Sequence, residues 1–174
     1  GKGIVSERIV VDTGSTDRTM EIARKMGAAV YEFPWANDFS AAKNYALSKA
    51  RCEWIVFLDA DEYFSPEDAQ KLPACLKQLP PDTYDGVITA FVDLDNEGKI
   101  LQVGSHLRVF RNLEGLRYCK RIHECLQKEG SQTIEAADMT GELSIFHTGY
   151  GKAEKQRKQG SRRNLDMILE ELKE

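Results

Sequence analysis

The sequence predicts an α/β fold, and three features support that prediction. The first is a strand–helix–strand order at the start: Ile9-Val10-Val11 is a β-branched run, a helical pattern follows, and residues 29–33 return to strand character, which indicates a parallel pair with a crossover. The second is the apolar run at residues 54–58, whose lack of polar alternation is typical of a strand buried on both faces. The third is the looser alternation from Gly86 onward, which predicts a half richer in strands.

The crossover helix is predicted between the first two strands. Residues 12–17 have turn chemistry throughout, and Thr16 or Asp17 is suited to cap a helix that follows. Apolar residues then recur at helical spacing, and Gly27 is expected to end the helix.

Two further helices are predicted from their capping residues. Asp38 is a suitable N-cap for a helix that runs to Ala50. Ser65 and Pro66 indicate another start, because a capping hydroxyl followed by proline in the first turn favours a helix. Pro73 is expected to break or kink that helix, since proline lacks the N–H and clashes with the preceding turn.

The second half is predicted to contain mostly strands and to close with a helix. Residues 96–99, Asn-Glu-Gly-Lys, are typical of a hairpin turn, and residues 107–110 and 143–146 are expected to be short strands. Residues 152–174 are predicted to form a C-terminal helix whose apolar positions repeat on one face. These positions are Leu165, Ile168, Leu169 and Leu172.

Composition limits the class of protein. With 174 residues, 41% hydrophobic and 30% charged, the chain matches one ordinary globular domain. Its apolar runs are far too short to span a membrane. The net charge of −4 argues against a broad nucleic-acid-binding surface, so nucleic acid is not expected as a partner. The four cysteines form no C-x-x-C pair, which predicts reduced thiols in a cytoplasmic protein.

One late segment is strongly basic despite the negative net charge. The favoured interpretation is a solvated helix face. The alternative is contact with phosphate or with the anionic inner face of a membrane, which would make the protein peripheral there. The basic residues are Lys152, Lys155, Arg157, Lys158, Arg162 and Arg163.

The strongest candidate for chemistry is the triplet Asp59-Ala60-Asp61, directly after the apolar run at 54–58. Side chains two positions apart on extended backbone point the same way, so the two carboxylates are expected to converge. A Mg²⁺ or Mn²⁺ ion would relieve their repulsion and could also bind phosphate oxygens. The alternative is a pair of exposed loop acids. His147 becomes a ligand candidate only if the fold brings it near Asp61.

Other candidate residues lie at a strand end, on the second helix and in the second half. Asp12 either accepts hydrogen bonds from a base or sugar edge or forms an Asx turn. Lys43 either donates to a diphosphate or is an ordinary solvated lysine. Glu124 beside His123 is a candidate general base, although the spacing alone favours a polar surface strand.

Six segments together carry motifs whose order and spacing resemble a known family. They are IVVDTGSTDRT (9–19), NDFSAAKN (37–44), WIVFLDADE (54–62), RVFRN (108–112), RIHE (121–124) and HTGY (147–150). Over about residues 8–151 the chain resembles the family 2 glycosyltransferases, which have the GT-A fold. The most similar subgroup is bacterial and includes enzymes similar to lipopolysaccharide-core glucosyltransferases and peptide S-glycosyltransferases.

The resemblance implies a Rossmann-like, three-layer sandwich with a mixed, mostly parallel sheet that binds a nucleoside-diphosphate sugar. The catalytic domain would cover residues 1–151, with a nucleotide-sugar part at about 8–64 and an acceptor part at about 86–151. Members of the family begin with a strand and helix ahead of the segment that corresponds to Ile9. The domain is therefore expected to be truncated at its N-terminus.

The resemblance also implies a role for each matching residue. Asp61 would bind the divalent metal, Mn or Mg, with His147 as a late ligand. Glu124, next to His123, would be the catalytic base. Lys43 stands where the family usually has arginine, which keeps the charge but loses the bidentate geometry. The residues implied to bind the nucleotide sugar are Asp12 at the base, Asp59 near the ribose, and Gly14, Ser15, Lys43 and Ala60.

The function implied by the resemblance is metal-assisted, inverting transfer of a sugar from a donor, UDP-linked by resemblance, to a glycan, lipid or peptide acceptor. One alternative is a sugar-phosphate nucleotidyltransferase, which would need a Gly- and Arg-rich phosphate loop that the sequence lacks near its start. The other is a nucleotide-sugar-binding domain without catalysis, which the missing opening strand keeps open.

Overall fold

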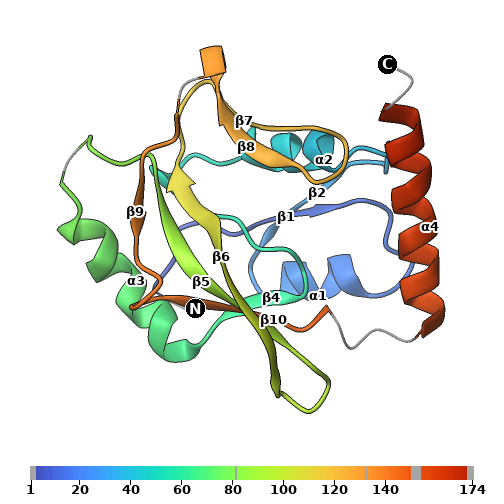
Figure 1. The fold of residues 1–174 in the computed structure, drawn as a ribbon, viewed down its shortest axis with the longest axis horizontal. Helices are drawn as coiled ribbons and strands as arrows, with labels where there is room; N and C mark the ends of the chain where they lie inside the picture. The colour runs from blue at the N-terminus through green and yellow to red at the C-terminus, as the bar shows by residue number, and fades with distance from the viewer. Residues whose placement is uncertain (1–2, 81, 132, 150–153, 172–174) are drawn as a thin grey trace. The chain divides into compact units, whose positions relative to one another are not determined.

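The computed structural model describes residues 3–80, 82–131, 133–149 and 154–171, with side chains for all of these except 131, 154–160, 170 and 171. The helices are α1 (Thr19–Lys25), α2 (Phe39–Leu47), α3 (Pro66–Gln78) and α4 (Glu154–Glu171), with a 3-10 turn, η1, at Glu129–Ser131. The strands are β1 (Ile9–Asp12), β2 (Ala29–Glu32), β3 (Trp54–Val56), β4 (Glu62–Phe64), β5 (Gly86–Leu94), β6 (Ile100–Arg111), β7 (Leu116–Cys119), β8 (Cys125–Lys128), β9 (Ala136–Asp138) and β10 (Ser144–His147) (Figure 1).

The chain divides into two compact units, each assembled from segments far apart in the sequence. The first unit comprises Gly1–Val5, Glu53–Leu113 and Ile134–Glu154, and the second comprises Ser6–Cys52, Glu114–Thr133 and Lys155–Glu174. Each unit therefore combines residues from the 8–64 part of the chain with residues from the 86–151 part.

The second unit begins with the predicted strand–helix–strand order. β1 and β2 pair in parallel with Ile9 opposite Ala29, and α1 connects them. The Asp17 carboxylate accepts a hydrogen bond from the Thr19 N–H at the start of α1 (2.9 Å). Gly27 follows the helix with φ of 80°, a conformation that favours glycine. The crossover predicted from the sequence is confirmed.

In the second unit α2 is tied to the hairpin of β7 and β8. Asp38 caps α2 as predicted, by accepting a hydrogen bond from the Ala41 N–H (2.9 Å). The Asn44 side chain bonds to the Tyr118 backbone in both directions: its Nδ2 donates to the carbonyl (2.8 Å) and its Oδ1 accepts from the N–H (2.9 Å). These bonds fix the hairpin against the helix and hold the loop between β7 and β8 beside it.

The first unit is built on a mixed sheet with the strand order β3-β6-β5-β10-β4, and β9 also pairs with β5. β5 and β6 form the predicted hairpin, in which the Asp95 carboxylate accepts a hydrogen bond from the Lys99 N–H (2.8 Å). β10 lies parallel to β5 and antiparallel to β4. The buried core of this unit consists of Leu72 from α3 with Val87, Val109 and Leu143.

The sheet confirms the mixed α/β class but corrects two details. Among the described strands β5 is parallel to β9 and β10, whereas the β3–β6, β5–β6 and β4–β10 pairs are antiparallel. The sheet is therefore not mostly parallel. The strand expected over residues 54–58 ends at Val56 and is half-buried rather than covered on both faces. β3 is an edge strand of this sheet and pairs with β6 on one side, so it is less covered than a central strand.

Pro73 does not end α3, so the break, one of its two expected effects, is absent. Ser65 caps the helix as predicted, and the helix runs through Pro73 to Gln78. On either side of the proline, Leu72 and Leu76 pack into the core of the first unit. This packing outweighs the loss of one backbone hydrogen bond in the helix.

The C-terminal helix is present as α4, but its burial differs from the predicted stripe. Leu165 and Leu169 are 54% and 47% exposed, whereas Met167 is buried. The Arg163 guanidinium lies over the rings of Trp35 and Phe39, 5.6 and 5.0 Å from their centroids. Met167 therefore lies on the side of α4 that packs within the second unit. Leu165 and Leu169 lie mostly on the exposed side.

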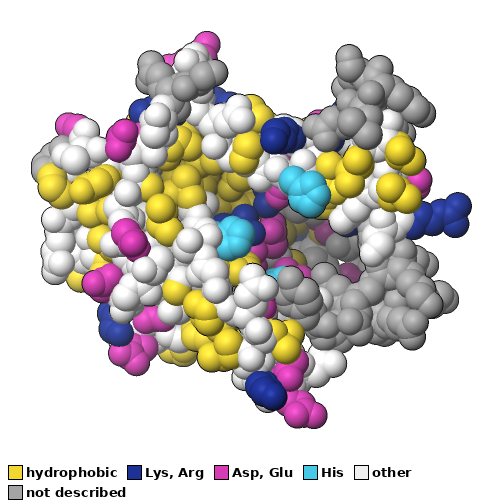
Figure 2. Space-filling view, viewed as in Figure 1, with side chains coloured by type: hydrophobic (Ala, Val, Ile, Leu, Met, Phe, Trp, Pro, Cys, Tyr) yellow, Lys and Arg dark blue, Asp and Glu magenta, His cyan; other side chains and the backbone are white. Residues whose placement is uncertain are grey.

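The basic segment is only partly described. Tyr150, Lys152 and Leu172 lie outside the described residues, and the described basic side chains of this segment, Arg162 and Arg163, are exposed. On the face in Figure 2, acidic and basic side chains are interspersed among apolar and uncharged ones. None of the helices in the described part of the chain has both the length and the apolarity needed to span a membrane.

Candidate functional site

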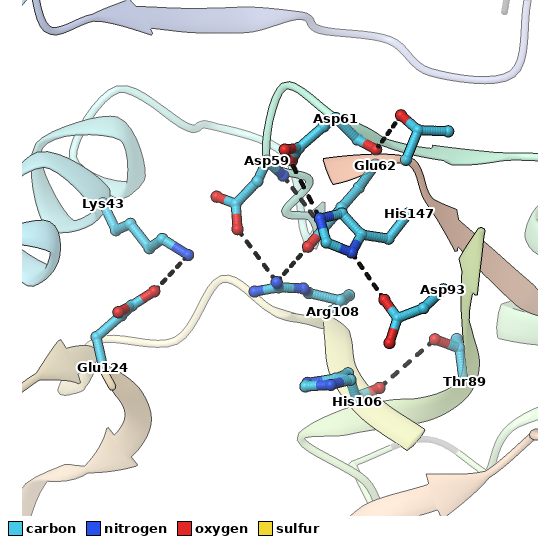
Figure 3. Close-up of polar contacts among 11 residues, drawn as sticks. Lys43, Asp59, Asp61, Glu62, Thr89, Asp93, His106, Arg108, Glu124 and His147 are labelled. Atoms are coloured by element: carbon cyan, nitrogen blue, oxygen red, sulfur yellow. Dashed lines mark hydrogen bonds and ion pairs between the residues drawn. The ribbon is translucent and has the colours of Figure 1, made fainter. Parts of the chain in front are cut away.

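Asp59-Ala60-Asp61 forms a tight turn rather than the end of an extended strand. The Glu62 N–H donates to the Asp59 carbonyl oxygen (3.0 Å), and the Asp59 N–H donates to Oε2 of Glu62 (3.2 Å). Ala60 is exposed within this turn. Because the backbone turns between them, the carboxylates of Asp59 and Asp61 reach different partners (Figure 3), contrary to the expectation from extended backbone.

Arg108 neutralises the first carboxylate of the triplet. Its Nη2 lies 3.1 Å from Oδ2 of Asp59 and also donates to Oε1 of Glu62. The Phe57 N–H donates to the Arg108 carbonyl oxygen (2.8 Å) next to the β3–β6 pairing, which fixes this arginine beside the turn. Glu62 is buried, and burial raises the pKa of its carboxyl while the charge of Arg108 opposes that shift.

The second carboxylate of the triplet faces a histidine. Oδ2 of Asp61 lies 3.6 Å from Nε2 of His147, and Nδ1 of the same ring lies 2.7 Å from Oδ1 of the buried Asp93. The sheet causes this arrangement, because His147 is opposite Asp93 in the β10–β5 pair and opposite Glu62 in the β10–β4 pair. The structure thus meets the condition set for His147 as a ligand candidate.

Asp61 and His147 could together contribute two ligands to a divalent cation. A carboxylate can only accept at 2.7 Å, so Asp93 favours a hydrogen on Nδ1 of His147, which would leave Nε2, 3.6 Å from Oδ2 of Asp61, for a cation. Within the described residues no group of three or more His, Cys, Asp or Glu side chains is arranged to hold an ion. Two protein ligands are compatible with Mg²⁺ or Mn²⁺ where diphosphate oxygens and water complete the shell.

In the second unit Asp12 forms the Asx turn that was one of its two predicted roles. Its Oδ1 accepts hydrogen bonds from the N–H groups of Gly14 (3.0 Å) and Ser15 (2.9 Å). Hydrogen bonds from the Ser15 side chain and backbone lower the pKa of the buried Asp12 carboxyl. Gly14 has φ of 120°, which strains any other residue. The end of β1 therefore holds a fixed, ionised carboxylate.

Lys43 and Glu124 are paired with each other in the second unit. Nζ of Lys43 lies 2.7 Å from Oε1 of Glu124, and the two side chains are 7% and 17% exposed (Figure 3). The Lys43 ammonium also lies 5.2 Å from the centroid of the Tyr118 ring. His123 is exposed and has φ of 53°. The residue expected at the diphosphate and the residue expected to be the base thus contact each other.

Three charged residues of the first unit were not predicted to have a role. Asp93 had a detectable signal, since it is the only charged residue in the apolar strand 86–94. Arg108 and Glu62 lie inside segments that carry the family resemblance, but no local pattern indicates that they pair. Their contact arises from the turn at Asp59 and the pairing of β3 with β6.

The sequence has clear relatives. Residues 4–134 match the family described as Glycosyl transferase family 2. A TPR repeat-containing protein of Synechococcus elongatus is 37% identical over 159 residues, which cover 87% of this chain and 38% of that protein. The SPbeta prophage-derived glycosyltransferase SunS of Bacillus subtilis is 28% identical over 181 residues, covering 97% and 39%. The chain thus spans less than two fifths of the length of these curated relatives.

A solved structure shares the fold. The crystal structure of S. aureus TarS matches 82% of this chain and 31% of its own chain, with a TM-score of 0.56 and 15% sequence identity. At this identity the likeness concerns the fold alone, and it confirms the GT-A fold expected from the sequence.

Proposed function

Because this chain belongs to glycosyltransferase family 2, we propose that it transfers a sugar from a nucleoside-diphosphate sugar, UDP-linked, to an acceptor with inversion at the anomeric carbon. The observation that carries this proposal is the Asp61–His147 pair, with 3.6 Å between Oδ2 and Nε2. An oxygen and a nitrogen ligand at this spacing suit a cation that also binds diphosphate. The acceptor class is a glycan, a lipid or a peptide.

Asp61 and His147 would hold the divalent cation, Mn²⁺ or Mg²⁺. When bound, the cation supplies a Lewis acid for the diphosphate leaving group. Arg108 neutralises Asp59 and the buried Glu62, so less negative charge from the turn opposes the approach of a diphosphate. Asp93 keeps the His147 ring oriented through the 2.7 Å contact at Nδ1.

Glu124 is the proposed base. It takes the proton of the acceptor nucleophile, a bond forms from that atom to the anomeric carbon, and the bond from this carbon to the diphosphate breaks, so that UDP leaves. Lys43 holds the Glu124 carboxylate at 2.7 Å, which orients the base. Asp12, with Gly14 and Ser15, is the proposed contact to the nucleotide.

A second candidate function is nucleotide-sugar binding without catalysis. It is favoured by the ion pair of Glu124 with Lys43, because one carboxylate oxygen of the proposed base is already bound to an ammonium. The two functions differ in whether a bound donor is turned over. We also propose a cytoplasmic location, supported by the free thiols at Cys52, Cys75, Cys119 and Cys125.

Calorimetry with UDP and MnCl₂, combined with release of free sugar from a UDP-sugar, tests the proposal. Asp61→Ala is expected to lose metal-dependent binding and turnover, while Asp166→Ala, at an exposed carboxylate on α4, retains both. Binding without any turnover in the wild type would support the second candidate function. Metal-dependent turnover that survives Asp61→Ala unchanged would show that the role of Asp61 is wrong.

A further inference from the structure

Gly149 lies directly beside the two proposed metal ligands. It follows β10 by two residues, and the intervening Thr148 is anchored to the Asp61 backbone. The Thr148 N–H and hydroxyl both donate to the Asp61 carbonyl oxygen, at 3.0 and 3.2 Å. The backbone at 148 is therefore tied to the turn that carries Asp61, and the backbone of Gly149 continues from this anchored position.

A side chain at position 149 would enter the gap between the ligand atoms. A Cβ built on Gly149 would overlap Nε2 of His147 and would lie 2.7 Å from Oδ2 of Asp61 and 2.9 Å from Cε1 of His147. Real Cβ atoms do not approach other heavy atoms this closely, so something would have to move. The backbone conformation of Gly149 is not one that only glycine adopts, so the space beside it is the reason that glycine is needed.

The histidine ring has little freedom to move away. Its Nδ1 is held at 2.7 Å by the buried Asp93, and the ring packs against Phe91 with 5.5 Å between centroids. Rotation of the ring would break the Asp93 contact and turn Nε2 away from Asp61. A methyl group at position 149 would therefore either occupy the space between the two ligand atoms or push these atoms apart.

We propose that Gly149 is a positioning residue whose missing side chain keeps the space between Asp61 Oδ2 and His147 Nε2 open for a divalent cation. This inference rests on the proposed function, since it concerns the same cation. It predicts that position 149 controls metal affinity without contributing a ligand atom. The three atoms nearest to a Cβ at this position all belong to the side chains of His147 and Asp61, so the overlap falls on the proposed ligands themselves.

The test compares Gly149→Ala with Gly141→Ala in the full 174-residue chain. Gly141 lies in the same unit, has no left-handed backbone, and a Cβ there would meet no atom within 4 Å. Mn²⁺ is titrated with and without UDP and followed by calorimetry. Gly149→Ala is expected to weaken Mn²⁺ binding by about tenfold or more, the scale of changes around metal ligands, whereas Gly141→Ala leaves it unchanged.

A second comparison separates local overlap from general damage to the fold. In the His147→Ala background the ring is gone, so adding Gly149→Ala should cost little further stability or affinity. Thermal unfolding of both alanine variants and of the double variant decides this even if Gly149→Ala alone fails to fold. A double variant that is much less stable than His147→Ala alone would overturn the proposal.

The outcomes also distinguish this inference from the proposed function. A wild type that binds neither Mn²⁺ nor UDP overturns both. A wild type that binds Mn²⁺ with UDP, together with a Gly149→Ala variant of equal affinity, overturns only the role of Gly149. Loss of affinity in Gly149→Ala with retention in Gly141→Ala supports it.

Discussion

Nζ of Lys43 on α2 lies 2.7 Å from Oε1 of Glu124 in the loop after β7, and both side chains are largely shielded from solvent. Two residues that the sequence places in separate roles are thus joined as an ion pair. Removing one charge from such a pair leaves the other in a poorly solvated place, which costs more than the pair itself contributes. The pair therefore links the integrity of the second unit to the orientation of the proposed base.

Lys43→Met is expected to destabilise the protein by about 2–3 kcal/mol, somewhat below the cost of breaking a fully buried ion pair. The physical reason is that the poorly exposed Glu124 carboxylate would lose the ammonium that lies 2.7 Å away. The double variant Lys43→Met/Glu124→Gln should recover most of the loss, because no unpaired charge remains. Urea unfolding at pH 7 measures the stability lost in Lys43→Met and the stability recovered in the double variant. A double variant no more stable than Lys43→Met would contradict the prediction.

Arg108→Met is expected to cost about 2–3 kcal/mol at pH 7 and less in acid. Burial already raises the pKa of Glu62 above its ordinary value of 4.5, and loss of the Arg108 charge would raise it further. When the pKa of a carboxyl is higher in the folded state than in the unfolded state, protonation of that group stabilises the fold. This stabilisation is complete below the unfolded pKa and is lost as pH rises through the folded pKa. The difference in free energy of unfolding between Arg108→Met and the wild type should therefore become smaller as pH falls toward 4.5.

Unfolding curves across pH, recorded with a chelator present, check the behaviour of Arg108→Met. Arg18→Met is the matched control, because Arg18 is 72% exposed in its pair with Glu21, where ion pairs contribute little. An Arg108→Met deficit that stays constant from pH 7 to pH 4 would rule out the role of Glu62.

Local elements of the fold are predictable because their signals lie within a few residues. The Asp38 cap and the hairpin turn at 96–99 are such cases. Features set by packing are not: Pro73 stays inside α3 because its neighbours reach the core. Likewise the spacing of leucines does not say which side of α4 packs, and the structure buries Met167 while leaving Leu165 exposed.

The sequence predicts individual residues of the candidate site but not the contacts between them. Asp61 and His147 carry motif signals, yet their contact depends on the register of β10 with its two neighbouring strands. Asp93 enters only through that register. The Lys43–Glu124 pair depends on how α2 meets the β7–β8 hairpin, which no short pattern encodes.

Asp12→Asn is expected to reduce stability by about 1 kcal/mol at neutral pH, the difference between a charged and a neutral hydrogen bond. Hydrogen bonds from Ser15 lower the pKa of Asp12 below its ordinary value of 3.8. A lowered folded-state pKa gives stability that is present above the unfolded pKa and is lost as pH falls through the folded value. Asparagine keeps the acceptor for the Gly14 and Ser15 N–H groups but not the charge.

The difference between Asp12→Asn and the wild type should therefore be largest above pH 3.8 and shrink below it. Thermal unfolding from pH 3 to pH 7 measures this difference. Asp138→Asn makes a useful comparison in the first unit, because hydrogen bonds from Thr140 lower the pKa of that exposed carboxyl as well. If the stability difference between Asp12→Asn and the wild type instead grew as pH falls, the lowered pKa of Asp12 would not be the cause of that difference.

Asp93→Asn is expected to lower Mn²⁺ affinity in the presence of UDP by about 10- to 100-fold, as for other partners of metal-binding histidines. A carboxylate 2.7 Å from Nδ1 of His147 favours a hydrogen there and leaves Nε2 toward Asp61, and a neutral amide would favour this tautomer and orientation less strongly. Ring nitrogen shifts of His147, measured by NMR in the metal-free protein, should change together with the calorimetric affinity. Unchanged shifts with reduced affinity would mean that Asp93 acts by another route than the orientation of His147.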